Sequence, residues 1–175
     1  MSKWDIFYYC YGVLHHPKYR KDFAGCLKRE LARVPFAPDF WPFARAGREL
    51  ADLHVGYENV EPLKLEWRET PGVPLSWRVE KMKWLDEAKT ALRVNDTLSL
   101  AGIPKEAHEY KLGNRSALDW LVDQYVVKRD RETHAVTSDP NRADDAEYIV
   151  RLVGQVARVS VETVRIVKEL SKKAW

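Results

Sequence analysis

The sequence contains little cysteine and no long apolar run. Its two cysteines, Cys10 and Cys26, are too few for a disulfide framework or for a zinc site made of cysteine alone. We therefore expect a reducing compartment, the cytoplasm. No uncharged apolar stretch approaches the roughly 18 residues of a transmembrane helix, so we expect no membrane partner. Lys3 and Asp5 interrupt the apolar start of the chain, which is untypical of a signal peptide.

Motifs of nucleotide, metal and methyl-transfer chemistry are also missing. The sequence has no G-x-x-x-x-G-K-[ST] phosphate loop, no Gly-rich dinucleotide fingerprint, no H-E-x-x-H and no paired C-x-x-C. Asp139-Pro140-Asn141 lacks the second proline and the aromatic ring of the amino-methyltransferase motif. The adjacent His15 and His16 diverge by about 100° on a helix, which suits a helix end better than a metal site. We therefore expect no cofactor, no metal and no catalysis by this chain.

Charge and aromatic content leave more options open. The 29 Lys and Arg residues exceed the 26 Asp and Glu residues by three, and this mild excess permits an anionic partner without requiring one. The chain has 7 Trp, 8 Tyr and 5 Phe among 175 residues. Such side chains either fill a core, the interpretation that we favour, or form a surface on which bases stack. At about 100–200 residues per domain, the length predicts one domain.

Residues 4–57 have the hydrophobic period of helices. A first helix is predicted to end at His16-Pro17, because the residue before proline disfavours the helical conformation. Pro17 suits the first turn of a second helix, whose apolar positions continue to Leu31. After a proline-bounded connection, Asp39 is the expected N-cap of a third helix.

Between residues 63 and 113 the period changes towards two. Alternating apolar and charged residues predict a strand over 63–68, and a weaker alternation predicts another over 77–84. Residues 70–74 have the proline and glycine of a turn. Residues 92–94 and 97–100, separated by Asn95-Asp96, are typical of a hairpin.

Helical patterns return after residue 113. Ser116 is a predicted N-cap, with Asp119 in the position of a capping box. Residues 128–141 are polar and are expected to form an exposed loop. A 3-4 stripe of apolar residues predicts one long helix over 144–172, which we expect to pack on its own domain rather than form a coiled-coil dimer.

These patterns predict an α+β fold in a single domain over 1–175. Helices occupy 1–62, a small central antiparallel or mixed sheet occupies 63–115, and helices including one long helix occupy 116–175.

A short nuclease-like pattern is a further alternative. Nucleases of the PD…ExK type hold magnesium with carboxylates and place a lysine near the attacking water. Pro38-Asp39 and Glu87-Ala88-Lys89 match this pattern. The motif is short, its two parts are far apart, and Asp39 already has the features of a helix cap, so we do not favour it.

Eight segments, in order along the chain, resemble one known family. They are residues 5–20 (DIFYYCYGVLHHPKYR), 34–36 (VPF) with Phe40-Trp41, 47–54 (GRELADLH), 57–58 (YE), 79–84 (VEKMKW), 98–104 (LSLAGIP), 110–121 (YKLGNRSALDWL) and, finally, 138–141 (SDPN). They are similar to the C-terminal specificity region of Type ISP restriction–modification enzymes. Those enzymes join nuclease, helicase-like ATPase, adenine methyltransferase and DNA target-recognition parts in one polypeptide.

The resemblance implies a target-recognition domain that binds double-stranded DNA in a sequence-specific manner. Methyltransferase and helicase domains of a larger enzyme would be its protein partners. The alternatives are a helical interaction module, which docks on a methyltransferase or on a second copy, and the metal-dependent nuclease. For the recognition domain we expect lysine and arginine to contact phosphates, and a side chain such as Arg78 or Arg115 to read a base edge.

The candidate DNA-binding residues are the basic, aromatic and amide-bearing side chains of the middle of the chain. Cations between planar groups are what a nucleic-acid surface needs, although neighbouring Glu and Asp residues could neutralise the same cations as ordinary surface pairs. The predicted set is Lys64, Arg68, Trp77, Arg78, Lys81, Lys83, Lys89, Arg93, Lys111, Asn114 and Arg115.

Overall fold

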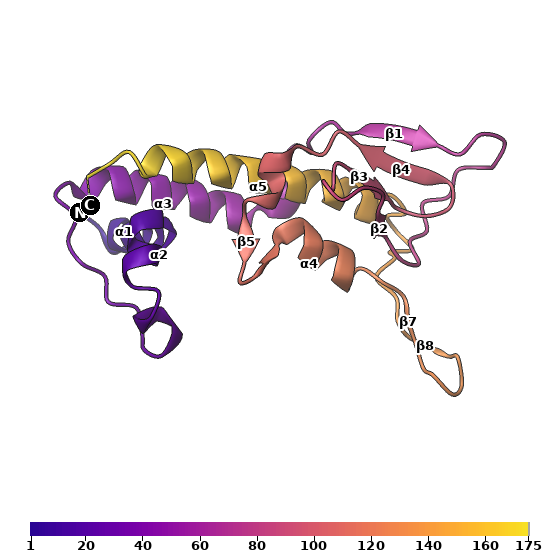
Figure 1. Cartoon of the computed structure of the whole chain (residues 1–175), viewed down its shortest axis with the longest axis horizontal. Coiled ribbons are helices and arrows are strands. Elements are labelled where there is room, and N and C mark those ends of the chain that lie inside the picture. Colours follow the sequence, from indigo (N-terminus) through magenta and orange to yellow (C-terminus); the bar gives the residue numbers. More distant parts are fainter. Residues whose placement is uncertain (175) are drawn as a thin grey trace. The chain divides into compact units, whose positions relative to one another are not determined.

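The computed structural model describes residues 1–174, which form two compact units (Figure 1). Unit 1 contains residues 1–57 and the chain from Glu162 onward, and unit 2 contains residues 58–161. The predicted α+β class is confirmed: helices lie at both ends, a small antiparallel sheet lies between them in the sequence, and the last helix is long. Within the described residues, no helix is long and apolar enough to cross a membrane.

Unit 1 is helical. It contains α1 (Lys3–His15), α2 (Pro17–Asp22), a 3-10 turn η1 (Cys26–Lys28), α3 (Phe40–Val55) and the end of α5 (Tyr148–Leu170). Ser2 and Asp5 form a reciprocal capping box at the start of α1. Asp39 caps α3 as predicted, because its carboxylate accepts a hydrogen bond from the Trp41 amide at 3.2 Å.

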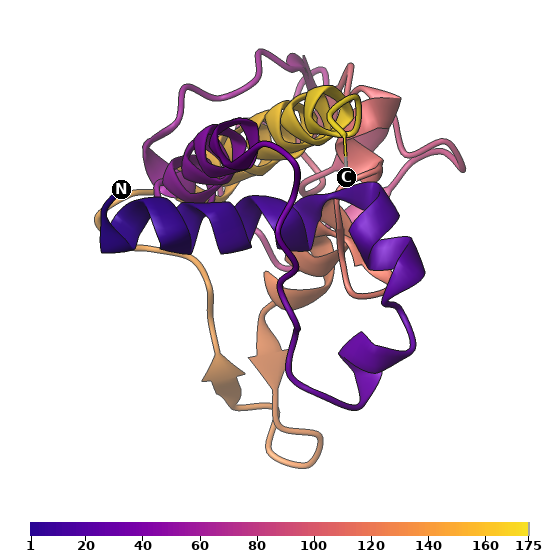
Figure 2. The ribbon, with the colours of Figure 1, turned by 90° about the vertical axis from the view of Figure 1, so that its left-hand side faces the viewer.

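The crossing of α1 and α3 organises unit 1, as Figure 2 shows. Gly12 of α1 and Gly47 of α3 face each other so closely that a Cβ atom on either glycine would strike main-chain atoms of the other helix. Around the crossing, Tyr9, Val13 and Phe43 form a buried cluster. The two glycines therefore allow the backbones to approach, and the apolar stripes then close around them.

The second helix is shorter than predicted, because α2 ends at Asp22. Tyr19 is buried and Phe23 is partly buried against the core of unit 1, but Leu31 is 93% exposed. Cys26, Leu27 and Leu31, the predicted apolar positions after Phe23, are thus all exposed, and packing supplies most of the stability of a short helix.

Unit 2 is built on a four-stranded antiparallel sheet with the order β1-β4-β3-β2. Its strands are β1 (Glu66–Glu69), β2 (Lys83–Trp84), β3 (Ala91–Arg93) and β4 (Leu98–Ala101). A 3-10 turn η3 (Lys105–His108), a short pair β5 (Lys111–Leu112) and β6 (Arg115–Ser116), α4 (Ala117–Gln124), a hairpin of β7 (Lys128–Arg129) and β8 (Val136–Ser138), and the first part of α5 follow. The 3-10 turn η2 (Tyr57–Asn59) lies at the boundary of the two units.

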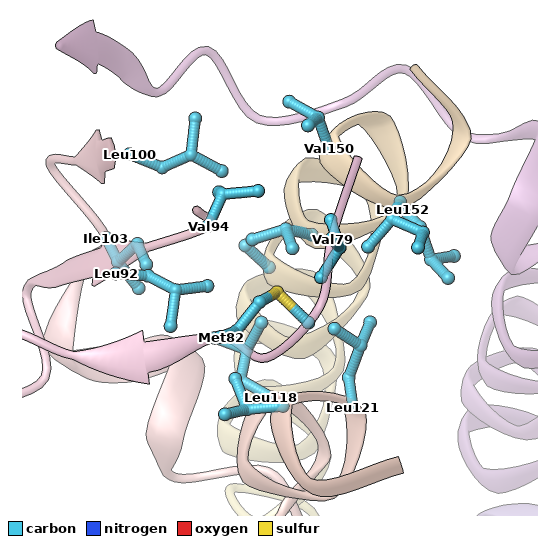
Figure 3. Close-up of a cluster of buried hydrophobic side chains, with 14 of the residues drawn as sticks. Val79, Met82, Leu92, Val94, Leu100, Ile103, Leu118, Leu121, Val150 and Leu152 are labelled. Carbon is cyan, nitrogen blue, oxygen red and sulfur yellow. The ribbon is translucent and has the colours of Figure 1, made fainter. Parts of the chain in front are cut away.

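The core of unit 2 lies between one face of the sheet, α4 and α5 (Figure 3). Leu92 and Leu100 come from adjacent strands, Leu118 and Leu121 come from α4, and Leu152 comes from α5; each is at most 2% exposed. Ser116 caps α4 as predicted and accepts a hydrogen bond from the Asp119 amide. The hairpin predicted over 92–100 and the helical stripe predicted for the C-terminal part are thus confirmed.

In unit 2, three predicted boundaries were wrong. The first strand begins at Glu66 rather than at residue 63, because the Leu63 amide donates to the Gly154 carbonyl of α5 at 3.0 Å. The strand predicted over 77–84 is reduced to Lys83–Trp84. The expected loop over 128–141 contains the β7–β8 hairpin.

Asparagine side chains explain the missing strand. The Asn141 side chain donates to the Val79 carbonyl and accepts from the Val79 amide, at 2.9 and 2.8 Å. Asn95 donates to the carbonyls of Ser76 and Arg78. From Ser76 to Val79 the backbone therefore bonds to amide side chains instead of a neighbouring strand, and beyond it only an isolated bridge forms, between Lys81 and Val126.

Candidate nucleic-acid interface

The sheet of unit 2 has one apolar face and one basic face. On the first, Trp84, Leu92 and Leu100 are cross-strand neighbours and pack into or against the core. The residues next to these in each strand point their side chains to the opposite face of the sheet. The basic residues therefore lie away from the core as a consequence of strand alternation.

A row of polar side chains crosses the whole basic face. Lys83 of β2 pairs with Arg93 of β3, Arg93 pairs with Ser99 of β4, and Ser99 pairs with Arg68 of β1. Lys83, Arg93 and Arg68 are exposed. The strand order thus places three cations and a hydroxyl group in one line, although they are spread over residues 68–99 of the sequence.

Lys83 and Arg93 form the least compensated part of this row. Arg68 is held by a bidentate ion pair with Glu66, at 3.0 and 2.8 Å. Among residues 1–174, neither Lys83 nor Arg93 makes an ion pair. Like charges directly opposite each other on neighbouring strands destabilise a sheet. An anion bound between these two side chains would relieve that repulsion.

An open groove of about 450 Å³ adjoins these two cations. Its cationic side chains are Arg78, Lys81, Lys83 and Arg93, and its acidic ones are Glu80 and Asp96. Ser76, Asn95 and Thr97 complete the lining. The groove therefore combines an excess of positive charge with hydroxyl and amide groups, which is the chemistry that binds phosphate oxygens.

The turn between β3 and β4 forms one wall of the groove, and Asn95 holds it in place. The Asn95 side-chain oxygen accepts from the amides of Thr97 and Leu98 at 2.8 and 2.9 Å, while its amide group donates to the Ser76 and Arg78 carbonyls. Asn95 thereby ties two segments of the wall together. This wall is pre-organised, so binding there costs little ordering of the backbone.

Arg78 lies at the rim of the groove, and its guanidinium group forms ion pairs with two carboxylates. Its guanidinium group donates to Glu80 at 2.9 Å and to Asp139 at 2.8 Å. Hydrogen bonds from the Asn141 side chain and amide, together with that from Arg78, lower the pKa of Asp139 to about 2. Arg129 donates to the other oxygen of Glu80 at 3.2 Å. Arg78 therefore belongs to a network that shapes the rim.

Lys89 also forms an ion pair, and it lies outside the row that crosses the basic face. Its ammonium group donates to Asp119 at 2.6 Å, and the Trp84 indole donates to the same oxygen at 3.0 Å. Burial raises the pKa of Asp119, but the hydrogen bonds from Lys89, Ser116 and Trp84 outweigh it, so the pKa lies below its usual value. This geometry assigns Lys89 a bracing contact between the strands and α4.

The remaining candidates lie in three other places. Lys64 is exposed ahead of β1, and Trp77 is partly buried, with its ring 5.3 Å from that of Trp67. Lys111, Asn114 and Arg115 lie in or between β5 and β6 and are exposed. Arg115 donates to Asp123 of α4 at 2.5 Å. The structure thus gathers Arg78, Lys81, Lys83 and Arg93 in one groove and leaves the other predicted residues outside it.

Sequence reasoning missed several groups at this interface. Ser99 joins the basic row only through the strand pairing, and Asn95 was interpreted only as a turn residue. Arg129 enters the rim network from the segment expected to be a loop. The signal that could have indicated Arg129 is the basic start of that segment, Lys128-Arg129, directly before a polar turn.

The nuclease-like pattern finds no support in the described part of the chain. Asp39 and Glu87 belong to different compact units, Asp39 caps α3, and Lys89 pairs with Asp119. Residues 1–174 contain no cluster of three or more His, Cys, Asp or Glu side chains that could hold a metal ion.

Comparison with known proteins defines the class of this fold. Residues 1–152 match the Type ISP C-terminal specificity domain. The chain belongs to this family. No curated protein sequence matches it.

Three solved structures are similar over 99% of the chain. One is a nuclease-deletion mutant of the Type ISP restriction-modification enzyme LlaGI in complex with a DNA substrate mimic, with 35% identity and a TM-score of 0.88. Another is the ATP-dependent Type ISP restriction-modification enzyme LlaBIII bound to DNA, with 31% identity and a TM-score of 0.89. The third is the DrdV–DNA complex, with 38% identity and a TM-score of 0.84. The match covers 16%, 11% and 18% of those chains, so this chain spans less than a fifth of each.

Proposed function

We propose that this chain binds double-stranded DNA in a sequence-specific manner, as the target-recognition domain of a restriction–modification system. The observation that supports this most directly is the groove beside β2 and β3, where Lys83 and Arg93 face each other without a carboxylate between them. DNA supplies the anions that such a site lacks, at one phosphate per roughly 1.7 Å of helix axis.

Membership of the specificity-domain family supports the same function. The similar chains of LlaGI, LlaBIII and DrdV were all solved with DNA or a DNA mimic. In this proposal the chain does no catalysis of its own. It positions the duplex for the methyltransferase and helicase parts of a longer enzyme, and it works in the cytoplasm, where bacterial restriction systems meet DNA.

In this proposal, different residues hold the phosphates of the duplex and read its base edges. Lysines act as point charges on phosphates, so Lys81 and Lys83 are assigned to holding. The arginine fork matches the O6 and N7 atoms of guanine. Within the groove, Arg93 is an arginine whose guanidinium group is not taken up by a carboxylate, whereas Arg78 is bound to two.

Salt-dependent binding tests the proposal. Replacing Lys81 and Lys83 together by alanine should weaken binding to every duplex and reduce the slope of log K against log salt by about 0.9 for each lost phosphate contact. The control is the double variant Lys21→Ala/Lys28→Ala, which removes the same charge from exposed positions of unit 1. The control should keep the parent's affinity and slope.

A gel-shift titration on mixed-sequence duplex, with and without magnesium, separates this function from the alternatives. A shift without cleavage in both conditions supports a binding domain. Cleavage that needs magnesium would support the nuclease, and the absence of any shift would favour a protein-interaction module. If the Lys81/Lys83 variant and the control behave alike, the groove is a solvated surface and the proposal is wrong.

A further inference from the structure

The β7–β8 hairpin is exposed along its entire length. Residues 128–139 are all exposed, on both faces of the hairpin. Lys128 pairs with Ser138, and Arg129 pairs with Val136. Figures 1 and 2 show the hairpin extending away from α4 and the rest of unit 2. Burial of apolar side chains therefore does not explain why this segment is structured.

Hydrogen bonds of the turn itself order the tip. The Asp130 carboxylate accepts from the amides of Glu132 and Thr133 and from the Thr133 hydroxyl, at 3.0, 2.8 and 2.9 Å. The Asp130 amide donates to the Ala135 carbonyl, and the His134 amide donates to the Asp130 carbonyl. The hydrogen bonds from Thr133 and Glu132 lower the pKa of Asp130 below its usual value, so the carboxylate stays charged. The tip is thus a defined shape held by one aspartate.

Three side chains at the tip take no part in this arrangement. Among residues 1–174, the side chains of Arg131, Glu132 and His134 form no hydrogen bond or ion pair, and Arg131 and His134 are the two that carry N–H donors. His134 has φ of +57°, a left-handed conformation in which glycine is the unstrained choice. A backbone outlier of this kind at an exposed tip points towards a role for the side chain.

The base of the hairpin is tied to the rim of the groove. The Val127 amide donates to the Glu80 carbonyl at 3.0 Å, and Arg129 donates to the Glu80 side chain. At the other end, Asp139 accepts from Arg78. The hairpin therefore emerges beside the groove, fixed at both strands.

We propose that the β7–β8 hairpin enters the major groove of the bound duplex and reads a base edge with Arg131, with His134 making a second contact. This inference rests on the proposed function and assigns its sequence-reading element. The major groove, about 12 Å wide, admits a two-stranded ribbon whose strands are about 4.8 Å apart. The lysines of the basic groove hold phosphates while the hairpin beside it reaches the bases.

Selection from a random duplex pool tests the inference with the full chain. Arg131→Ala should relax the enriched motif at one base pair, by about 5- to 150-fold in relative affinity, while affinity for unrelated duplex changes far less. His134→Gly should also relax the motif, and its melting temperature should equal or exceed that of the parent, because glycine removes the left-handed strain. Arg29→Ala, an exposed arginine of unit 1, is the control and should retain the parent motif.

The outcomes separate this inference from the proposed function. If the parent enriches a motif and both hairpin variants enrich the same motif with equal stringency, the hairpin does not read bases, while the DNA-binding function stands. If the parent binds duplex without enriching any motif, or binds none, both the sequence-specific function and the hairpin assignment are overturned. Relaxation at one base pair in Arg131→Ala, absent in Arg29→Ala, supports the hairpin.

Discussion

Replacing Gly47 by alanine tests the helix crossing on which unit 1 depends. A Cβ atom at residue 47 would lie 1.8 Å from the Tyr8 carbonyl oxygen and 2.7 Å from the Gly12 nitrogen. Both are main-chain atoms of α1, so no change of side-chain rotamer relieves the overlap. The two helices would have to separate, and the packing of Tyr9, Val13 and Phe43 around the crossing would loosen.

Two effects of opposite sign determine the size of the change. Alanine is a better helix former than glycine, which alone would stabilise the helix by about 1 kcal/mol. Overpacking costs about 1–3 kcal/mol, and a backbone overlap belongs at or above the upper end of that range. The net expectation is a destabilisation of about 2 kcal/mol. For a chain of this length, that lowers Tm by about 4–8 °C.

Thermal unfolding followed by circular dichroism would measure this effect. Gly25→Ala is the matched control, because a Cβ atom there meets nothing within 4 Å and the residue has φ of −70°. The control should be neutral, or more stable by up to about 1 kcal/mol. If Gly47→Ala melts at or above the parent temperature, helix propensity outweighs packing at this crossing, and our account of unit 1 is wrong.

Further expectations concern Arg78, Arg115 and His54. Arg78→Ala should weaken binding to all duplexes about equally, because Asp139 then lies beside the groove without its cation and Glu80 keeps only Arg129. Relaxation at a single base pair in the selection assay would show instead that Arg78 reads DNA. Arg115→Ala should leave binding and motif unchanged if its contact with Asp123 is its main role, and a relaxed motif would assign it to reading. Burial lowers the pKa of His54 to about 4, so the unfolded chain takes up the proton first as the pH falls. Unit 1 should therefore lose stability between about pH 6.5 and pH 4. In His54→Gln, the urea midpoint should depend less on pH over this range.

Much of the secondary structure follows from local sequence. Asp39 and Ser116 cap their helices because a short polar side chain can bond to an amide two or three residues ahead. The hairpin around Asn95-Asp96 and the long C-terminal helix follow from turn chemistry and from the hydrophobic period. Each of these features depends on residues close together in the sequence, so periodicity and spacing were sufficient to predict it.

The candidate interface depended on contacts that local pattern does not encode. Lys83 and Arg93 stand opposite each other because β2 pairs with β3, and Arg68 joins their row through β4. Asn141 holds Val79 across 62 positions of the sequence, where alternation had predicted a strand. Local sequence sets the preferred dihedral angles and the polar or apolar character of each side chain. The packing of distant segments decides which cations lie side by side and which carboxylates neutralise them, because charge pairing depends on distance in space.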